Sequence, residues 1–388
     1  MRARVLFLFL LLWGGATGWS QPLLRPADPA AAGMSREQLK VAAAILEREV
    51  GQGRLPAAAI LVARGGRVVL NQAFGRMGRE PGTAPVTPDS VFLLASITKP
   101  VTACAVMRLV DAGRISLDDP VSHYLPEFKG DGRDEVRIRD LLRHTSGLPD
   151  MLPENIELRR AHAPLSEFVR RTLTTPLLYK PGAGFGYQSM GILLAGEIVE
   201  RTSGMRLRDF MKQEIFEPLG MNASSLGLGG RAVSDTVWCC EPEGDPADTA
   251  RFGPNTLYWR DMGHPWGGMH STTGDLALLL QTMLNDGVYA GRRLFSRAAV
   301  RAMIRNQNPG TKTPWGLGWA LAESPVWAYF GELVSPETFG HVGATGTVAW
   351  ADPKNETLCV ILTNRSVSAD GGRLLRLVSN AVAAAVEE

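Results

Sequence analysis

The stretch Val91–Val110 reads VFLLASITKPVTACAVMRLV and places a Lys three residues after a Ser. Apolar residues lead into Ser96, and beyond Lys99 an apolar spacing typical of a helix continues until Gly113. We therefore expect Ser96 in the first turn of a helix, where backbone N–H groups lack partners and the macrodipole is positive. Lys99 then shares a face with Ser96 and can act on its hydroxyl proton. The pattern predicts a nucleophile, although an N-cap Ser beside an exposed Lys has the same spacing.

A Gly-rich loop downstream supplies a candidate partner for Ser96. Residues 180–191 present Tyr187 and Ser189 just before a predicted helix. A Tyr held near a cation can lose its proton below its ordinary pKa of about 10, so a Tyr187 phenolate could take the proton from Ser96. A partly buried Tyr packed at a helix start is the structural alternative.

A third motif lies near the end of the chain. Residues 339–346 read FGHVGATG and open the strand of a predicted hairpin. Glycines at a strand edge, Gly343 among them, let a substrate backbone approach, and an exposed N–H there can help to bind a tetrahedral oxyanion. His341 could bind a substrate carboxylate or assist proton transfer near neutral pH, or it could be a satisfied structural His.

Taken in order, these motifs resemble the active-site motifs of the serine β-lactamase and penicillin-binding-protein superfamily: Ser96-x-x-Lys99, Tyr187-x-Ser189 and His341-x-Gly343. The chain is most similar to the branch that contains class C β-lactamases, family VIII carboxylesterases and DD-peptidases. Further stretches that resemble this branch lie at residues 141–148, 267–276 and 315–319. The resemblance covers nearly the whole chain after its N-terminal segment.

The resemblance implies a role for each matching residue. Ser96 would be acylated, Lys99 would tune the protons of the site, and Tyr187 would be general base for attack and general acid toward the leaving group. The backbone N–H groups of Ser96 and Ala344 would form the oxyanion hole. The substrate cleft would be lined by Ser189, His341, Gly343 and Ala344, and the resemblance implies no metal and no other cofactor.

Two positions depart from the pattern of the branch. Ser189 stands where the second motif commonly has Asn, whose amide can both donate and accept. His341 stands where many members have the Lys of Lys-Thr-Gly, so a largely neutral imidazole replaces a permanent positive charge. Both differences favour an uncharged ester or amide over a β-lactam or a D-Ala terminus.

Strand patterns lie near both ends of the chain, at residues 57–74 and 346–364, and helix patterns flank them. They predict an α+β fold of the β-lactamase/transpeptidase type, in which both chain ends form one antiparallel sheet flanked by helices and a mostly helical region is inserted. Residues 222–265 show no clear pattern, which predicts a long irregular excursion of the kind that often shapes a substrate entrance.

We expect one hydrolase domain at residues 21–388. Its α/β part covers about residues 21–95 and 310–388, and its helical region covers about residues 96–309. The first 20 residues differ in kind: two Arg, an apolar run at residues 5–13 and then small residues have the order of a secretory signal peptide. The apolar run is too short to span a bilayer. We therefore expect an exported protein, periplasmic or secreted, with no stable membrane anchor after cleavage.

The composition narrows the possible partners. Lys and Arg number 41 against 39 Asp and Glu, with no long basic run, so neither nucleic acid nor an anionic membrane surface is expected as a partner. Four cysteines do not make a disulfide scaffold, and the redox state of the adjacent Cys239 and Cys240 stays open, as does the oligomeric state.

The sequence thus predicts an exported serine hydrolase that cleaves a small ester, amide or D-amino-acid peptide through an acyl-Ser96 intermediate. One alternative is a β-lactamase or DD-carboxypeptidase acting on cell-wall-like substrates. Another is a non-catalytic binder of peptidoglycan or of a partner protein, which would have no need of Ser96, Lys99 and Tyr187 together.

Overall fold

The computed structural model describes residues 23–241 and 244–387, so the predicted signal peptide lies outside the described residues. Its main feature is a seven-stranded sheet built from both ends of the chain, and the predicted α+β fold is confirmed. Neighbouring strands are antiparallel, except that Arg25–Pro26 and Arg67–Gly75 pair in parallel. The strands lie in the order β1 (Arg25–Pro26), β3 (Arg67–Gly75), β2 (Ala57–Arg64), β12 (Thr357–Thr363), β11 (Thr347–Asp352), β10 (Phe339–Gly343) and β9 (Ala320–Leu321).

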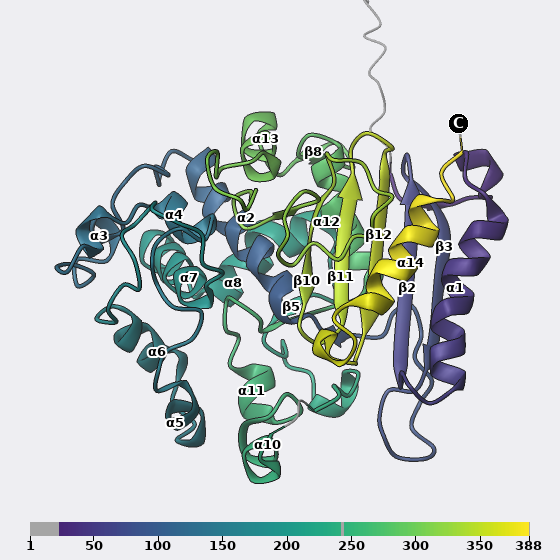
Figure 1. The fold of residues 1–388 in the computed structure, drawn as a ribbon, viewed down its shortest axis with the longest axis horizontal. Helices are drawn as coiled ribbons and strands as arrows, with labels where there is room; N and C mark the ends of the chain where they lie inside the picture. Colours follow the sequence, from purple (N-terminus) through teal and green to yellow (C-terminus); the bar gives the residue numbers. More distant parts are fainter. Residues whose placement is uncertain (1–22, 242–243, 388) are drawn as a thin grey trace, which may run out of the picture.

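Helices cover both faces of this sheet. Figure 1 shows α1 (Arg36–Gly51) and α14 (Arg373–Ala383) over one face, while α12 (Thr273–Leu284) packs on the other. Neighbouring residues of β2 belong to different cores, since Ile60 packs with the terminal helices and Leu61 with the helical region. Both faces of β2 are therefore buried, which explains why its sequence is continuously apolar from Ala57 to Ala63 instead of alternating.

The helical region lies beside the sheet. Its central helix, α2 (Thr98–Asp111), follows directly on the one-turn helix η2 (Ala95–Ile97). Pro100 fits in the first turn of α2, where N–H groups have no intrahelical partner. The other helices are α3 (Val121–Tyr124), α4 (Ile138–Leu142), α5 (Asn155–Arg160), α6 (Leu165–Thr172), α7 (Ser189–Ser203), α8 (Leu207–Met211), α9 (Glu217–Leu219), α10 (Pro246–Phe252), α11 (Leu257–Asp261) and α13 (Arg297–Ile304).

Two small sheets complete the fold. One supports the segment before Ser96 and has the strand order β4 (Phe92–Leu93), β6 (Met269–Ser271) and β5 (Ser225–Leu226). The other is a short hairpin of β7 (Val288–Tyr289) and β8 (Arg292–Arg293). Within the part of the chain that the structure describes, no helix is both long and apolar enough to cross a bilayer.

The excursion at residues 222–265 contains more order than its sequence predicts. Helix α10 has Pro at its first position, and its N-cap Asp245 accepts a hydrogen bond from the Ala247 N–H. Helix α11 begins after Thr256, whose hydroxyl accepts from the Trp259 N–H. Neither helix was predicted, because each spans two turns or fewer and is too short to show an apolar periodicity. Their capping residues are nevertheless visible in the sequence.

The final strands also differ from the prediction. The sequence places the His341 motif at the opening of a two-stranded hairpin, but the motif forms a strand of its own, β10, which pairs with β11. A tight turn joins them, in which the Gly346 N–H donates to the Gly343 carbonyl at 3.0 Å. Gly346 has φ 88°, a left-handed conformation that favours glycine. The strands β10, β11 and β12 therefore form a three-stranded meander, and the turn between β10 and β11 lies against the segment before Ser96.

Gly343 sets how closely this meander approaches the segment before Ser96. The Thr345 hydroxyl donates to the Leu93 carbonyl at 3.0 Å, and the Thr347 hydroxyl donates to the Leu94 carbonyl at 2.8 Å. A Cβ at Gly343 would overlap both the Leu94 carbonyl and the Thr347 hydroxyl. From the sequence, Gly343 is expected to let a substrate backbone approach the strand. In the structure it admits the protein's own backbone.

We predict that Gly343→Ala lowers the free energy of unfolding by about 1–3 kcal/mol, because the added methyl group forces the sheet and the Ser96 segment apart. Urea unfolding followed by circular dichroism measures this change. Gly51→Ala is the matched control, since a Cβ at that exposed helical position would contact no atom beyond its own helix backbone. Equal stability of the two variants would contradict the proposed contact.

Candidate active site

Ser96 lies in the one-turn helix η2, at the junction between the small sheet and α2. The residue before it, Ala95, has φ 50°, which is uncommon for a residue other than glycine. Such strained conformations cost about 1–3 kcal/mol and cluster at functional sites. The Ser96 side chain is half-buried, so its hydroxyl is held by the fold and still accessible.

The amine of Lys99 lies directly against this hydroxyl. Its Nζ is 3.0 Å from Ser96 Oγ and donates to the Trp266 carbonyl at 3.0 Å. Lys99 is only 1% exposed, and it forms no ion pair within the described residues. Burial lowers the pKa of Lys99 to about 7, while the negative charge of Asp150 acts in the opposite direction. A substantial fraction of this amine is therefore neutral at physiological pH.

Two threonines of α2 hold the segment that carries the Trp266 carbonyl. Thr102 Oγ1 donates to the Pro265 carbonyl at 2.7 Å, and Thr98 Oγ1 accepts from the Met269 N–H at 3.0 Å. In the sequence, residues 267–276 stand out only because they resemble the same branch of the superfamily. The Trp266 carbonyl was missed, because a backbone acceptor has no signature in a sequence.

Tyr187 lies on the other side of Lys99, with its ring centroid 4.7 Å from Nζ. Its hydroxyl is buried and has no hydrogen-bond partner among the described residues. Burial raises the pKa of Tyr187, and the nearby Ser96 hydroxyl counteracts this only in part. The direction is opposite to the expected lowering, because desolvation of the phenolate outweighs the nearby cation. In this structure the phenol is neutral, and Lys99 is the group with an available base form.

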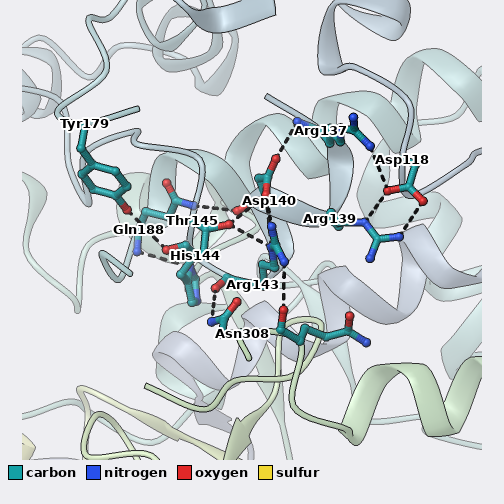
Figure 2. A network of polar contacts seen from close by, with 11 residues as sticks. Asp118, Arg137, Arg139, Asp140, Arg143, His144, Thr145, Tyr179, Gln188 and Asn308 are labelled. Atoms are coloured by element: carbon teal, nitrogen blue, oxygen red, sulfur yellow. Dashed lines mark hydrogen bonds and ion pairs between the residues drawn. The ribbon is translucent and has the colours of Figure 1, made fainter. Parts of the chain in front are cut away.

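A polar network fixes the loop that carries Tyr187 (Figure 2). The His144 carbonyl accepts from the Gly186 N–H at 3.0 Å, and His144 Nδ1 accepts from the Gln188 N–H at 3.3 Å. The Gln188 side-chain amide donates to the Asp140 carbonyl at 3.1 Å. Asp140 is in turn paired with Arg143 at 2.8 Å. The residues on both sides of Tyr187 are thus anchored, which restricts the position of its hydroxyl.

Ser189 is tied to a residue that the sequence analysis missed. Its Oγ donates to Asp150 Oδ1 at 2.6 Å, and its N–H donates to the same oxygen at 2.9 Å. Asp150 is exposed, and its charge acts on both Lys99 and Tyr187. The Ser189 hydroxyl is therefore engaged within the protein and places a carboxylate beside the catalytic candidates. The only signal for Asp150 was its position just after the stretch at residues 141–148.

His341 lies fully buried in β10, facing the candidate residues. Its ring centroid is 6.1 Å from that of Tyr187, and its Nδ1 lies 2.7 Å from the Val342 carbonyl. Burial and the Lys99 charge lower the pKa of His341 to about 3, so the imidazole is neutral. Strand β9 pairs only with Phe339 and Gly340, which leaves the outer edge of β10 unpaired from His341 onward.

Ala344 lies exposed in the turn after β10. Its N–H has no acceptor among the described residues, whereas its carbonyl accepts from the Val367 N–H at 3.0 Å. The Thr345 and Thr347 hydroxyls hold this turn against the segment that leads to Ser96. The structure therefore brings the Ala344 N–H to the side of the Ser96 helix turn, where two N–H groups can stabilise a developing oxyanion.

A cavity of about 420 Å³ opens beside Ala344. It extends from the turn after β10 to helices α5, α10 and α11, and its walls are mostly apolar. It is lined by Ile156, Arg159, Cys239, Cys240, Gly244, Asp245, Asp248, Thr249, Phe252, Gly253, Pro254, Trp259, Ala344, Thr345 and Ser366. The excursion thus builds a pocket next to the candidate oxyanion hole. Cys239 and Cys240 in its wall are both free thiols.

The chemistry that these groups support is acyl transfer to a serine. The hydroxyl, a partly neutral amine and a neutral phenol meet at one point, with an unpaired N–H nearby. Across residues 23–241 and 244–387, no three His, Cys, Asp or Glu side chains are grouped so that they could hold a metal ion.

Comparisons with known proteins identify the family and the fold. A model of the family described as Beta-lactamase matches residues 42–383. A Salmonella agona protein provisionally named D-alanyl-D-alanine carboxypeptidase is 32% identical over 395 residues, covering 94% of this chain and 90% of that protein. A penicillin-binding protein homologue from Caulobacter crescentus is 25% identical, with a TM-score of 0.72 over 90% of this chain and 99% of its own. A family VIII carboxylesterase, 20% identical, shares the fold with a TM-score of 0.71 over 90% and 99% of the two chains.

We predict that Asp150→Asn shifts the acid limb of the pH profile of kcat/KM to lower pH. The Asp150 charge raises the pKa of Lys99, so its removal lets Lys99 lose its proton at a lower pH. Ester turnover measured between pH 5 and 9 tests this. Ser189→Ala is the control, because it removes the hydrogen bond and keeps the charge. A midpoint that moves to higher pH in Asp150→Asn, or that moves equally in both variants, would contradict the role of the charge.

Proposed function

The chain belongs to the Beta-lactamase family and is a serine hydrolase, and we propose that it cleaves a small ester, amide or D-amino-acid peptide through an acyl-Ser96 intermediate. The observation that carries this proposal is the buried Lys99 amine, 3.0 Å from Ser96 Oγ and with a pKa of about 7. An amine of this kind can accept the hydroxyl proton at neutral pH, which an ordinary lysine cannot.

The first half of the reaction forms the acyl-enzyme. Ser96 Oγ attacks the substrate carbonyl carbon as its proton passes to neutral Lys99, whose other hydrogen bond to the Trp266 carbonyl orients the amine. The Ser96 and Ala344 N–H groups bind the oxyanion. When the intermediate collapses, the leaving group takes a proton from the Tyr187 hydroxyl, and Lys99 returns a proton to Tyr187.

Hydrolysis of the acyl-enzyme then uses the same groups in the reverse order. A water molecule attacks the acyl carbon, its proton passes to the Lys99 and Tyr187 pair, and Ser96 Oγ leaves with a proton from that pair. The neutral phenol suits this relay because it can donate and accept in turn without carrying a charge in a buried site. This assignment replaces the expectation of a stable Tyr187 phenolate with a base role for Lys99.

A DD-carboxypeptidase activity is the second candidate. Its support is the 32% identical relative that carries this name, together with the unpaired outer edge of β10, along which an extended peptide could form strand-like hydrogen bonds. Cell-wall-like substrates would place the protein outside the cytoplasm, in line with the signal-peptide pattern of residues 1–20.

We predict that Ser96→Ala lowers the hydrolysis of p-nitrophenyl butyrate by about 10³-fold or more, because the nucleophile is lost. A fluorophosphonate reagent should add mass to the peptide that contains Ser96 in the wild type and not in the variant. Equal residual rates in both proteins would instead support a non-catalytic binding protein. Parallel assays with D-Ala-D-Ala peptides and nitrocefin separate the esterase, peptidase and β-lactamase activities.

We predict that Tyr187→Phe lowers kcat by about 10²–10⁴-fold while the acylating reagent still reaches Ser96, because only the proton relay is removed. Stopped-flow measurement of acylation and steady-state turnover tests this. Tyr329→Phe is the matched control, since the contact of the Tyr329 ring with the Arg376 guanidinium does not need the hydroxyl. Loss of activity of the same size in both variants would contradict a specific role for the Tyr187 hydroxyl.

A further inference from the structure

Arg159 is the one arginine in the wall of the cavity beside Ala344. Its guanidinium Cζ lies 3.8 Å from the centroid of the Trp259 ring, and its Nε is buried without a hydrogen-bond partner. Within the described residues, Arg159 forms no ion pair with a carboxylate. Burial lowers the pKa of Arg159 to about 10, so it keeps its charge at neutral pH.

The carboxylates in the same wall are already engaged. Asp248 receives two hydrogen bonds from Arg160, at 2.8 and 2.7 Å, and this pair links α5 to α10. Asp245 caps α10 through the Ala247 N–H at 2.8 Å. Among the described residues, Arg159 is therefore the charged side chain of the wall with neither a hydrogen bond nor an ion pair. A guanidinium in this state is suited to bind an anion in a bidentate manner.

The surroundings place this cation near the reacting groups. Trp259, on which Arg159 stacks, contacts His264 with a centroid distance of 4.3 Å, and His264 contacts Trp266 at 4.7 Å. The Trp266 carbonyl is the acceptor for Lys99. At its other end the cavity reaches Ala344, the candidate oxyanion donor. The cavity therefore connects the candidate oxyanion donor Ala344 with Arg159.

We propose that this cavity is a substrate subsite for an arm with an apolar body and a terminal carboxylate, which Arg159 binds. The inference rests on the proposed function and makes its substrate class more specific. The neutral His341 supplies no positive charge to the cleft, and Arg159 supplies one from a different wall. The sequence alone favours an uncharged substrate. The subsite instead implies a substrate whose carboxylate lies at the end of an arm, away from the scissile bond.

The test compares two esters of similar length, p-nitrophenyl pentanoate and mono-p-nitrophenyl glutarate, the second ending in a carboxylate. The wild type is expected to favour the glutarate ester in kcat/KM, and Arg159→Met to reduce the glutarate-to-pentanoate ratio by about 10- to 100-fold. Arg159→Lys, which keeps the charge and loses the bidentate geometry, should retain part of the preference. Arg251→Met removes the same charge from an exposed position of α10 outside the cavity and should leave the ratio unchanged.

A binding measurement does not depend on catalysis. Glutarate added to the Ser96→Ala protein should change tryptophan fluorescence through Trp259 and raise Tm, and both effects should be lost when Arg159→Met is added. An unchanged ester ratio, or glutarate binding that survives Arg159→Met, would overturn the subsite while leaving the hydrolase intact. Failure of the wild type to hydrolyse either ester would count against the proposed function, and glutarate binding would then decide the subsite alone.

Discussion

The Lys99 amine is buried against Ser96 and the Trp266 carbonyl, and no ion pair from the described part of the chain compensates for its loss of water. The drop in its pKa from 10.5 to about 7 corresponds to about 5 kcal/mol of folding stability. This cost is fully present below pH 7 and disappears as the pH rises toward 10.5, because only the protonated amine resists burial. It is large beside the net stability of about 5–15 kcal/mol that is typical of a folded protein. Apolar burial in the two cores on either side of the sheet therefore has to offset the free-energy cost of burying Lys99.

Several parts of the fold serve to keep that amine dry and oriented. The threonines of α2 hold the Trp266 carbonyl in place, and the His144 and Gln188 network anchors the Tyr187 loop. The turn between β10 and β11 is hydrogen-bonded to the segment before Ser96. These supports come from segments far apart in the chain. The small sheet joins them, because β4 precedes Ser96 and β6 follows the Trp266 segment. Preorganisation of this kind lets the site act without rearranging when charge develops.

The same buried environment divides the chemistry among the groups. Desolvation lowers the pKa of Lys99 and His341 and raises that of Tyr187, so all three favour their neutral forms. Only Lys99 has a pKa near the physiological range, and the exposed Asp150 keeps it from falling further. The charge of Asp150 therefore acts on the reaction through Lys99, and in the subsite proposed above Arg159 of α5 acts on the choice of substrate.

The sequence by itself determined the α+β fold, the family and the main candidates for the site, Ser96, Lys99 and Tyr187. Apolar periodicity, the capping of α1 and the spacing of Ser96 and Lys99 are local properties, and local properties can be read along a chain. The order of three motifs then identified Tyr187 and the His341 strand, although no residue pattern gave their distances.

The tertiary structure alone decided the protonation states of the site and the contacts that hold its reacting groups in place. The pKa of Tyr187 depends on how completely its ring is buried, and burial is set by segments that the sequence places far away. The Ser189–Asp150 bond, the Trp266 carbonyl and the contact of Gly343 with Leu94 join residues with no shared motif. The unpaired charge of Arg159 became visible only when α5, α10 and α11 were packed together, because a missing partner is a property of three-dimensional neighbours and not of sequence spacing.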